Sequence, residues 1–173
     1  RTGRAMRSII VVSSHHHGNT EKVARALAGV LGADLTRPQD ADLRRLGRYD
    51  LVGFGSGIDS DRHYSALLDL AAELPRAGGA KAFIFSTCGI PVAVAGEAAI
   101  EKYSARSHAA LRERLVSRGY AVIGEFSCAG HNSNSFLRLF GGLNKGRPDA
   151  GDLDRAEEFA RALAAELEKR RTA

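Results

Sequence analysis

The stretch SSHHHGNTEK, residues 13–22, holds the densest group of side chains that could do chemistry, and it lies between an apolar run and a helix-like segment. Hydroxyl groups, three histidines and Gly-Asn-Thr therefore stand where a helix is expected to begin. The first backbone N–H groups of a helix have no partners within it, and the helix dipole adds positive partial charge. The stretch thus predicts an anion-binding loop, which can hold a phosphate group by amides alone.

Individual side chains of this loop can add to that binding. Gly18 lets the backbone approach a ligand closely, and the Asn19 amide and the Thr20 hydroxyl can donate to phosphate oxygens. His16 and His17 can donate hydrogen bonds in their neutral or charged form. Two alternatives remain: the histidines hold a metal, or Gly-Asn-Thr is only a turn and a helix cap. The metal site is disfavoured because neighbouring side chains of an extended loop point to different sides.

The rest of the chain alternates between strand and helix patterns. Apolar, β-branched runs predict strands at residues 7–13, 33–37, 49–56, 80–87 and 120–128. Apolar residues at helical spacing predict helices at residues 19–31, 64–74, 104–118 and 152–170, with a polar connection at 38–48 and a long loop at 129–151. This alternation predicts an α/β domain with a parallel sheet that helices cover on both faces.

Three of the predicted strands end in residues unusual for a buried strand. These ends are residues 13–20, residues 55–64 with the motif GSGID, and residues 86–91 with the motif STCGIP. Ligands of open α/β sheets bind beyond the carboxyl ends of the strands, where the strand order reverses. We therefore expect the three ends to form one site.

The strand, the hydroxyl-rich loop with Gly-Asn-Thr-Glu, the helix and the glycine-rich strand ends together resemble the flavodoxin-like FMN-binding family, over essentially the whole chain. The likeness is greatest to bacterial flavodoxin family proteins with the same loop and a late NKGRPD segment, here residues 144–149. We therefore expect a flavodoxin-like three-layer α/β/α sandwich whose five-stranded parallel sheet has the order 2-1-3-4-5. Residues 6–173 should form one domain, and residues 1–5 an added or disordered start.

The resemblance also implies the residues that contact FMN. The loop around the phosphate comprises Ser14, His15, His16, His17, Gly18, Asn19 and Thr20. The loops that flank the ring comprise Ser56, Gly57, Ile58 and Asp59, and Ser86, Thr87, Cys88, Gly89 and Ile90. Flavodoxins usually sandwich the ring between aromatic side chains, but His63 and Tyr64 are expected to belong to the following helix. We therefore expect looser flavin binding and a less depressed redox potential than in flavodoxins.

These features predict redox chemistry carried out by FMN, in an oxidoreductase or an electron carrier. Electrons would come from a nicotinamide cofactor or a reductase and pass to an acceptor that the sequence does not specify; an FMN-dependent NAD(P)H oxidoreductase is one such enzyme. No side chain is singled out as catalytic. Flavodoxin carriers are typically acidic, whereas this chain has a net charge of +5 and a pI near 9.6. A flavoenzyme, or a carrier with an acidic partner, is therefore favoured.

Two alternatives belong to other functional classes. The first is a binding or regulatory domain that keeps the fold without flavin, which the missing aromatic residues favour. The second is a phosphate-ester enzyme that uses Cys88 or a loop histidine. It is disfavoured because Cys88 and Cys128 both lie far in sequence from residues 14–20.

Length and composition bear on which other kinds of protein this chain can be. The chain has 173 residues, 44% of them hydrophobic, which suffices for one core. No apolar run approaches the roughly 20 residues needed to cross a bilayer, so we expect a cytoplasmic protein that does not bind membranes. Scattered basic residues and 6% aromatic residues argue against nucleic-acid binding. Two cysteines without a C-x-x-C pair argue against a disulfide framework or a zinc site. We expect the protein to be a monomer or a homodimer.

For several individual residues the sequence allows two different roles. The Cys88 thiol contacts the flavin or is only packed, and packing is favoured for it and for Cys128. The long loop, which begins with His131, Asn132 and Asn134, is a lid or a solvated segment. The run Asp59, Asp61, Arg62 and His63 faces a substrate or starts a helix. Lys145 and Arg147 meet an anionic cofactor or belong to a turn.

Overall fold

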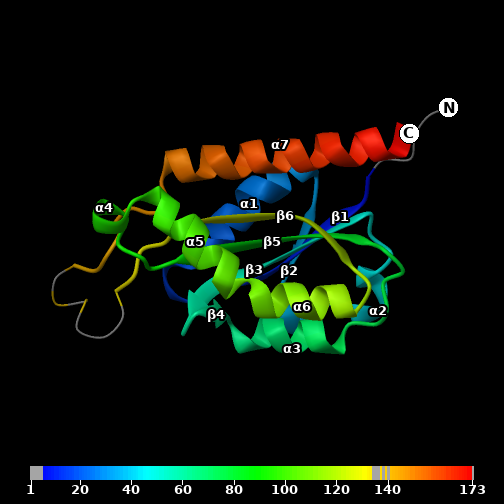
Figure 1. The fold of residues 1–173 in the computed structure, drawn as a ribbon, viewed down its shortest axis with the longest axis horizontal. Coiled ribbons are helices and arrows are strands. Elements are labelled where there is room, and N and C mark those ends of the chain that lie inside the picture. Colours follow the sequence, from blue (N-terminus) through cyan, green and yellow to red (C-terminus); the bar gives the residue numbers. More distant parts are fainter. Residues whose placement is uncertain (1–5, 134–136, 138, 140, 173) are drawn as a thin grey trace.

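The computed structural model describes residues 6–133, 137, 139 and 141–172, and within these residues five parallel strands form a central sheet (Figure 1). The strands are β1 (Ser8–Ser13), β2 (Asp34–Thr36), β3 (Leu51–Asp59), β5 (Lys81–Cys88) and β6 (Ala121–Ala129). A two-residue strand, β4 (Arg62–His63), pairs antiparallel with the end of β3. The order across the sheet, β2-β1-β3-β5-β6, confirms the predicted order 2-1-3-4-5.

Helices form a layer on each face of this sheet (Figure 1). One core, against β1, β3 and β5, contains residues of α1 (Asn19–Leu31) and α7 (Ala150–Thr172). The core on the other face contains residues of α3 (Ser65–Glu73) and α6 (Ala109–Ser117). The remaining helical segments are η1 (His16–Gly18), η2 (Pro38–Asp40), α2 (Leu43–Leu46), α4 (Val92–Ala95) and α5 (Glu97–Ser107). The α/β/α sandwich is thus confirmed.

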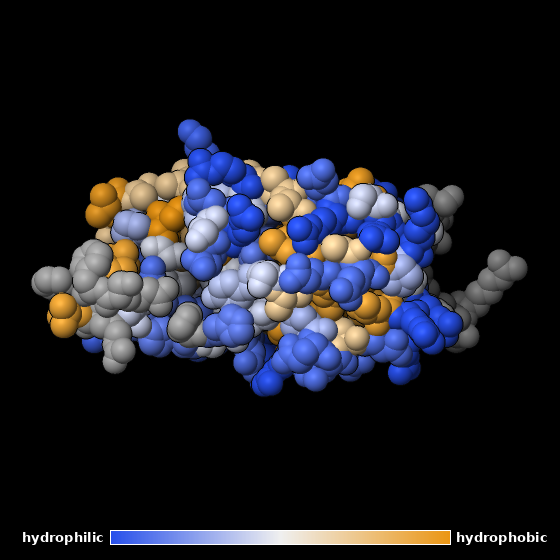
Figure 2. Space-filling model, turned by 90° about the horizontal axis from the view of Figure 1, so that it is seen from below, coloured by the Kyte–Doolittle hydropathy of each residue, from blue (hydrophilic) through white to orange (hydrophobic). Residues whose placement is uncertain are grey.

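The outward sides of the helices carry mostly polar side chains. Figure 2 shows the face over α3 and α6, where hydrophilic residues predominate and apolar residues show between them. This pattern is expected for the outer layer of a sandwich whose helices turn their apolar stripe to the sheet. Among the described residues, no helix is long and apolar enough to cross a membrane.

Two phenylalanines of β5 pack over two glycines of β3. Gly53 and Gly55 of β3 lie opposite Phe83 and Phe85 in the register of the sheet. The two rings lie over the glycines, and a Cβ atom at either glycine would overlap the facing ring. Both rings are fully buried, on the face that α1 and α7 cover. The glycines of this strand therefore make room for aromatic packing in the core.

The chain between β5 and β6 differs from the prediction. In place of one helix at 104–118 there are two, α5 and α6, which meet at His108. The His108 ring is 1% exposed, and its Nε2 lies 2.7 Å from Ser86 Oγ in β5. The break in the helix places this ring inside the domain. The predicted polar connection at 38–48 is also partly helical, since it contains η2 and α2.

The end of β3 differs as well, because Asp59 and Arg62 belong to a hairpin and not to the start of a helix. Ser60 and Asp61 have φ angles of 49° and 61°, as the two central residues of a type I′ turn do. Tyr64 follows β4 and precedes α3, so the prediction that it belongs to the helix is wrong. The hairpin leaves Tyr64 at the edge where the strands end.

We expect Gly55→Ala to lower the free energy of unfolding by about 1–3 kcal/mol, because the added methyl group overlaps the Phe85 ring. Urea unfolding followed by circular dichroism measures the change. The matched control is Gly29→Ala in α1, where a Cβ atom meets nothing within 4 Å and helix propensity favours alanine by up to about 1 kcal/mol. Equal stability of the two variants would contradict this account of the β3–β5 contact.

Candidate functional site

A cleft with about 460 Å³ of empty space, open to solvent, lies at the carboxyl edge of the sheet. Segments that follow β1, β3, β5 and β6 form its sides. The residues that line it are Ser14, His15, Asn19, Thr20, Gly57, Ile58, Tyr64, Thr87, Cys88, Gly89, Gly130, His131 and Asn132. The three strand ends expected to form one site therefore meet in one cleft, and the end of β6 joins them.

The N-terminus of α1 forms one side of the cleft. The chain enters the helix through Gly18, which has a φ of 63°. The Ser14 hydroxyl accepts a hydrogen bond from the backbone N–H of Glu21 at 3.4 Å. Other N–H groups of the first turn have no partners within the helix, and the dipole places positive partial charge there. This side of the cleft therefore suits an anionic group.

The hydroxyl groups of Thr20 and Thr87 pair with each other across the cleft floor. Their Oγ1 atoms lie 2.8 Å apart, and both side chains are buried. Two hydroxyl groups carry two hydrogens, of which this contact uses one. The pair thus joins α1 to β5 and still has a hydrogen to donate.

Asn19 presents an unsatisfied acceptor. Its side chain is 8% exposed, and its Nδ2 donates to the carbonyl oxygen of His131 at 2.8 Å. Its Oδ1 is buried and has no hydrogen-bond partner among the described residues. The sequence predicts that the amide N–H donates to a phosphate, whereas here one of its two hydrogens is donated to His131 within the protein. A ligand or water with an O–H or N–H group would satisfy Oδ1.

Two pairs of rings border the opening. The ring centroids of His15 and Tyr64 lie 4.8 Å apart, and those of His17 and His131 lie 4.4 Å apart in a stacked arrangement. Tyr64 lies close against Gly57, where a Cβ atom would overlap its hydroxyl. Burial, followed by the charge of Asp59, raises the pKa of Tyr64, so its hydroxyl is neutral at physiological pH. An aromatic ring is therefore present where the sequence predicted none.

The expected binding residues divide into two sets. Those that line the cleft are Ser14, His15, Asn19, Thr20, Gly57, Ile58, Thr87, Cys88 and Gly89. Those outside its lining are His17, Gly18, Ser56, Asp59, Ser86 and Ile90. The side chain of His16 lies outside the described part of the structure. Because alternate strand residues point to opposite faces, the serines before Gly57 and Thr87 turn away from the residues that follow them.

Four lining residues were not expected to contact the ring or the phosphate. They are Tyr64, Gly130, His131 and Asn132. The sequence predicts His131 and Asn132 only as part of a lid or of a solvated segment. Asn134, which belongs to the same prediction, lies outside the described residues. The predicted strand order could have indicated the residues after β6, since it places the end of the fifth strand beside the end of the fourth.

A layer of buried polar side chains lies below the cleft. Ser86 and Ser127 are neighbours in register, and their Oγ atoms lie 2.8 Å apart. His108 Nε2 contacts Ser86 Oγ at 2.7 Å, and its Nδ1 contacts Glu125 Oε2 at 2.9 Å. Arg112 pairs with the same carboxylate at 2.8 Å. This Ser–His–Glu arrangement resembles a nucleophile triad, but Ser86 is 0% exposed and no substrate reaches it.

Charge in this layer is controlled by burial and pairing. Burial would raise the pKa of Glu125, but hydrogen bonds from His108 and Arg112 lower it to about 2. Burial lowers the pKa of His63 to about 3, His108 adds to the effect, and Glu125 opposes it. His63 is therefore neutral, and its Nδ1 lies 2.8 Å from the hydroxyl of Ser56. That hydroxyl also accepts from the backbone N–H of Tyr64 at 3.1 Å.

The two cysteines occupy different places. Cys88 lies in the cleft with 2% exposure, and burial raises the pKa of its thiol. Cys128 is fully buried in the core with α1 and α7, and burial also raises its pKa. Within the described residues, no group of three or more histidine, cysteine or acidic side chains is arranged to hold a metal ion.

The charged residues near the hairpin and in NKGRPD do not line the cleft. Asp61 forms an ion pair with Arg106 at 3.6 Å, and Asp59 is exposed. Lys145 is exposed, whereas the Arg147 guanidinium is paired with Asp152. The expectation that Arg147 belongs to a turn is thus incomplete, because its side chain forms an ion-pair cluster.

We compared the chain with known proteins by sequence and by structure. No family model matches the chain. The uncharacterized protein MJ0298 of Methanocaldococcus jannaschii is 36% identical over 158 residues, which are 91% of this chain and 98% of that protein. Oxidised Flavodoxin 2 from Bacillus cereus matches with a TM-score of 0.62 and 20% identity, over 92% of this chain and 99% of that one. Rubredoxin oxygen:oxidoreductase from Desulfovibrio gigas matches with a TM-score of 0.65 and 15% identity, over 96% of this chain and 37% of that one. The fold is therefore flavodoxin-like.

We expect acid to destabilise the protein through His63. The unfolded chain binds a proton at this residue below about pH 6.5, whereas the native state binds it only near pH 3. Stability is therefore lost as the pH falls, by about 2 kcal/mol between pH 6.5 and 4.5. Glu125 adds a further loss between its ordinary value of 4.5 and about 2. Urea unfolding at a series of pH values measures both.

The variant His63→Gln should flatten the dependence between pH 6.5 and 4.5, even if its stability at pH 7 is lower. His17→Gln removes an exposed imidazole and serves as the control. An equally steep pH dependence in wild type and His63→Gln would exclude His63 as the cause.

Proposed function

Because the chain belongs to the same family as MJ0298 and has a flavodoxin-like fold, we propose that it binds FMN in the cleft and takes part in redox chemistry. One observation carries this proposal: the N-terminus of α1 and the ends of β3 and β5 meet in one cleft. The strand order reverses between β1 and β3, and this is where open α/β sheets bind their ligands.

The side chains present fit such a ligand in three ways. The N-terminus of α1 and the Ser14 hydroxyl would hold the phosphate. The buried Oδ1 of Asn19 would accept a hydrogen bond from a hydroxyl of the ribityl chain. Tyr64 would contact the ring from the side of Gly57. Bound FMN would supply the electron transfer that amino-acid side chains do not provide.

The electron donor in this proposal is a nicotinamide cofactor or a reductase. With a net charge of +5, the chain suits an acceptor protein whose surface is acidic, because opposite charges speed encounter. We propose a monomer or a homodimer, with no role for nucleic acid or membrane.

A flavin-free binding domain is the second candidate, and a specific observation favours it. The Thr20 hydroxyl and the Asn19 amide nitrogen, both expected to bind phosphate, each make a hydrogen bond within the protein, to Thr87 and to His131, so that only part of their donor capacity is left for a phosphate. In this case the cleft would hold another polar ligand.

Phosphate-ester chemistry has less support. Cys88 lies far from residues 14–20 in sequence, but the fold brings it into the same cleft. Burial nevertheless raises the pKa of the Cys88 thiol, and the thiolate is the nucleophilic form. A thiol with a raised pKa is a poor nucleophile at neutral pH.

FMN binding is tested by titration, with flavin fluorescence and visible absorption as the signals. We expect FMN to bind and riboflavin, which lacks the phosphate, to bind at least about tenfold more weakly. Ser14→Asp keeps an acceptor at the helix start but adds a negative charge beside the phosphate. It should weaken FMN binding by about tenfold or more and affect riboflavin little.

Ser117→Asp is the matched control, since Ser117 ends α6 at the opposite edge of the sheet and gains the same charge. Equal loss in both variants would point to net charge in place of a phosphate site. If a folded wild-type protein does not bind FMN at high concentration, the proposed function fails and the flavin-free binding domain takes its place.

A further inference from the structure

After β6 the chain passes one side of the cleft, and before α7 it comes back to the same side. The backbone N–H of His131 donates to the carbonyl oxygen of Arg147 at 3.0 Å. Asn132 and Leu143 form a two-way bridge, with N–H···O distances of 2.9 and 2.7 Å. The outgoing and returning segments are therefore paired directly behind the residues that line the cleft.

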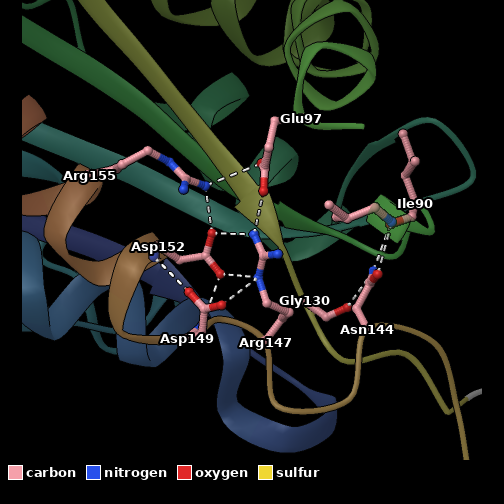
Figure 3. Close-up of polar contacts among 9 residues, drawn as sticks. Ile90, Glu97, Gly130, Asn144, Arg147, Asp149, Asp152 and Arg155 are labelled. Atoms are coloured by element: carbon pink, nitrogen blue, oxygen red, sulfur yellow. Dashed lines mark hydrogen bonds and ion pairs between the residues drawn. The ribbon is translucent and has the colours of Figure 1, made fainter. Parts of the chain in front are cut away.

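Asn144 joins this pair to the neighbouring strand end (Figure 3). Its Nδ2 donates to the carbonyl oxygens of Ile90 at 2.7 Å and Gly130 at 3.3 Å. Its Oδ1 accepts from the backbone N–H of Val92 at 3.1 Å. Its φ of 53° turns the backbone so that one short side chain reaches the segments after both β5 and β6. Asparagine suits this position because it tolerates a positive φ and carries both donors and an acceptor.

Arg147 fixes the returning segment to α7 and α5. Asp152 is 0% exposed and accepts from Arg147 and, at 2.6 Å, from Arg155 (Figure 3). Glu97, at the start of α5, pairs with Arg147 at 2.8 Å and with Arg155 at 3.3 Å. The hydrogen bond with Asp152 raises the pKa of Arg147, so the guanidinium stays charged. A buried carboxylate with this many partners holds its arginines firmly in place.

These contacts bear on the cleft through Gly130, His131 and Asn132. Asn132 packs against Gly89, where a Cβ atom would overlap its side chain. The carbonyl oxygen of His131 accepts from Asn19 at the start of α1. A shift of this segment would therefore disturb the phosphate side and the ring side of the cleft together.

We infer that Asn144 and Arg147 are positioning residues of the cleft, which hold Gly130, His131 and Asn132 in place as its fourth side. The NKGRPD segment thus acts through the cleft wall and does not contact the ligand. The effect on FMN rests on the proposed function, whereas the effect on the wall belongs to the protein without ligand.

The first measurement is hydrogen–deuterium exchange of the FMN-free protein. Asn144→Gly keeps the positive φ and removes every side-chain hydrogen bond of Asn144. We expect exchange at the amides of Val92, His131, Asn132 and Leu143 to become about tenfold faster or more, while core amides of β1 and β3 stay unchanged. Lys145→Ala changes the exposed neighbour and should leave exchange at these amides at the wild-type rate.

The second measurement is FMN affinity together with thermal stability. Asn144→Gly should lower the unfolding midpoint, because three backbone groups lose their partner, and should also weaken FMN binding by about tenfold at temperatures where the variant is fully folded. Arg147→Lys keeps the charge but loses the two-pronged contact with Asp152, and it should weaken binding in the same direction. If Asn144 only stabilised the fold, the variant would have a lower midpoint, but its folded form would bind FMN with wild-type affinity.

Unchanged exchange in Asn144→Gly overturns the inference, whatever FMN does. Faster exchange with FMN affinity at the wild-type level in both variants also overturns it, because the wall would then not belong to the site. If wild-type protein does not bind FMN, the proposed function fails, and the exchange result alone decides whether Asn144 holds the wall.

Discussion

The hydrogen bonds of the buried His108 ring are the constraint on which the cleft depends. One nitrogen contacts Ser86 in β5, the other contacts Glu125 in β6, and the residue itself lies at the junction of α5 and α6. A ring in the interior needs partners for both nitrogens, because an unpaired polar atom there is costly. These bonds therefore fix two strands and a helix junction relative to one another. The residue of β5 that they hold, Ser86, directly precedes Thr87, which lines the cleft.

The period of two along a strand lets each strand end serve two purposes. Ser86 turns to the polar layer below the cleft, and the next residue, Thr87, turns to Thr20 and the start of α1. The same division occurs in β3, where Ser56 contacts His63 and Gly57 lies under Tyr64. The residues that support the cleft and the residues that line it thus alternate along each strand, so that the cleft walls rest on paired polar groups as well as on apolar packing.

The sequence allowed the bounds of α1 and the meeting of three strand ends to be predicted, because these follow from local periodicity and from the geometry of parallel sheets. The sheet order was predicted from the resemblance to the flavodoxin-like family, since local patterns do not specify which strands are neighbours. The partners of Asn19 and Thr20 could not be predicted in the same way, since those partners lie 112 and 67 positions away. Tyr64 was misplaced because a two-residue turn of Ser and Asp lacks the usual Asn-Gly signal. The buried position of His108 goes with hydrogen bonds to Ser86 and Glu125, 22 and 17 positions away, which no local pattern encodes.

The pairing of Asn19 with His131 also bears on how the chain folds. A contact between residues 112 positions apart forms only after a large loop of chain has closed, which makes such contacts late and slow. The fourth side of the cleft, formed by Gly130, His131 and Asn132, therefore reaches the other three only when β6 has joined the sheet. A nascent chain that has left the ribosome as far as β5 already contains residues 13–20 and the N-terminus of α1, but it still lacks the side of the cleft that follows β6.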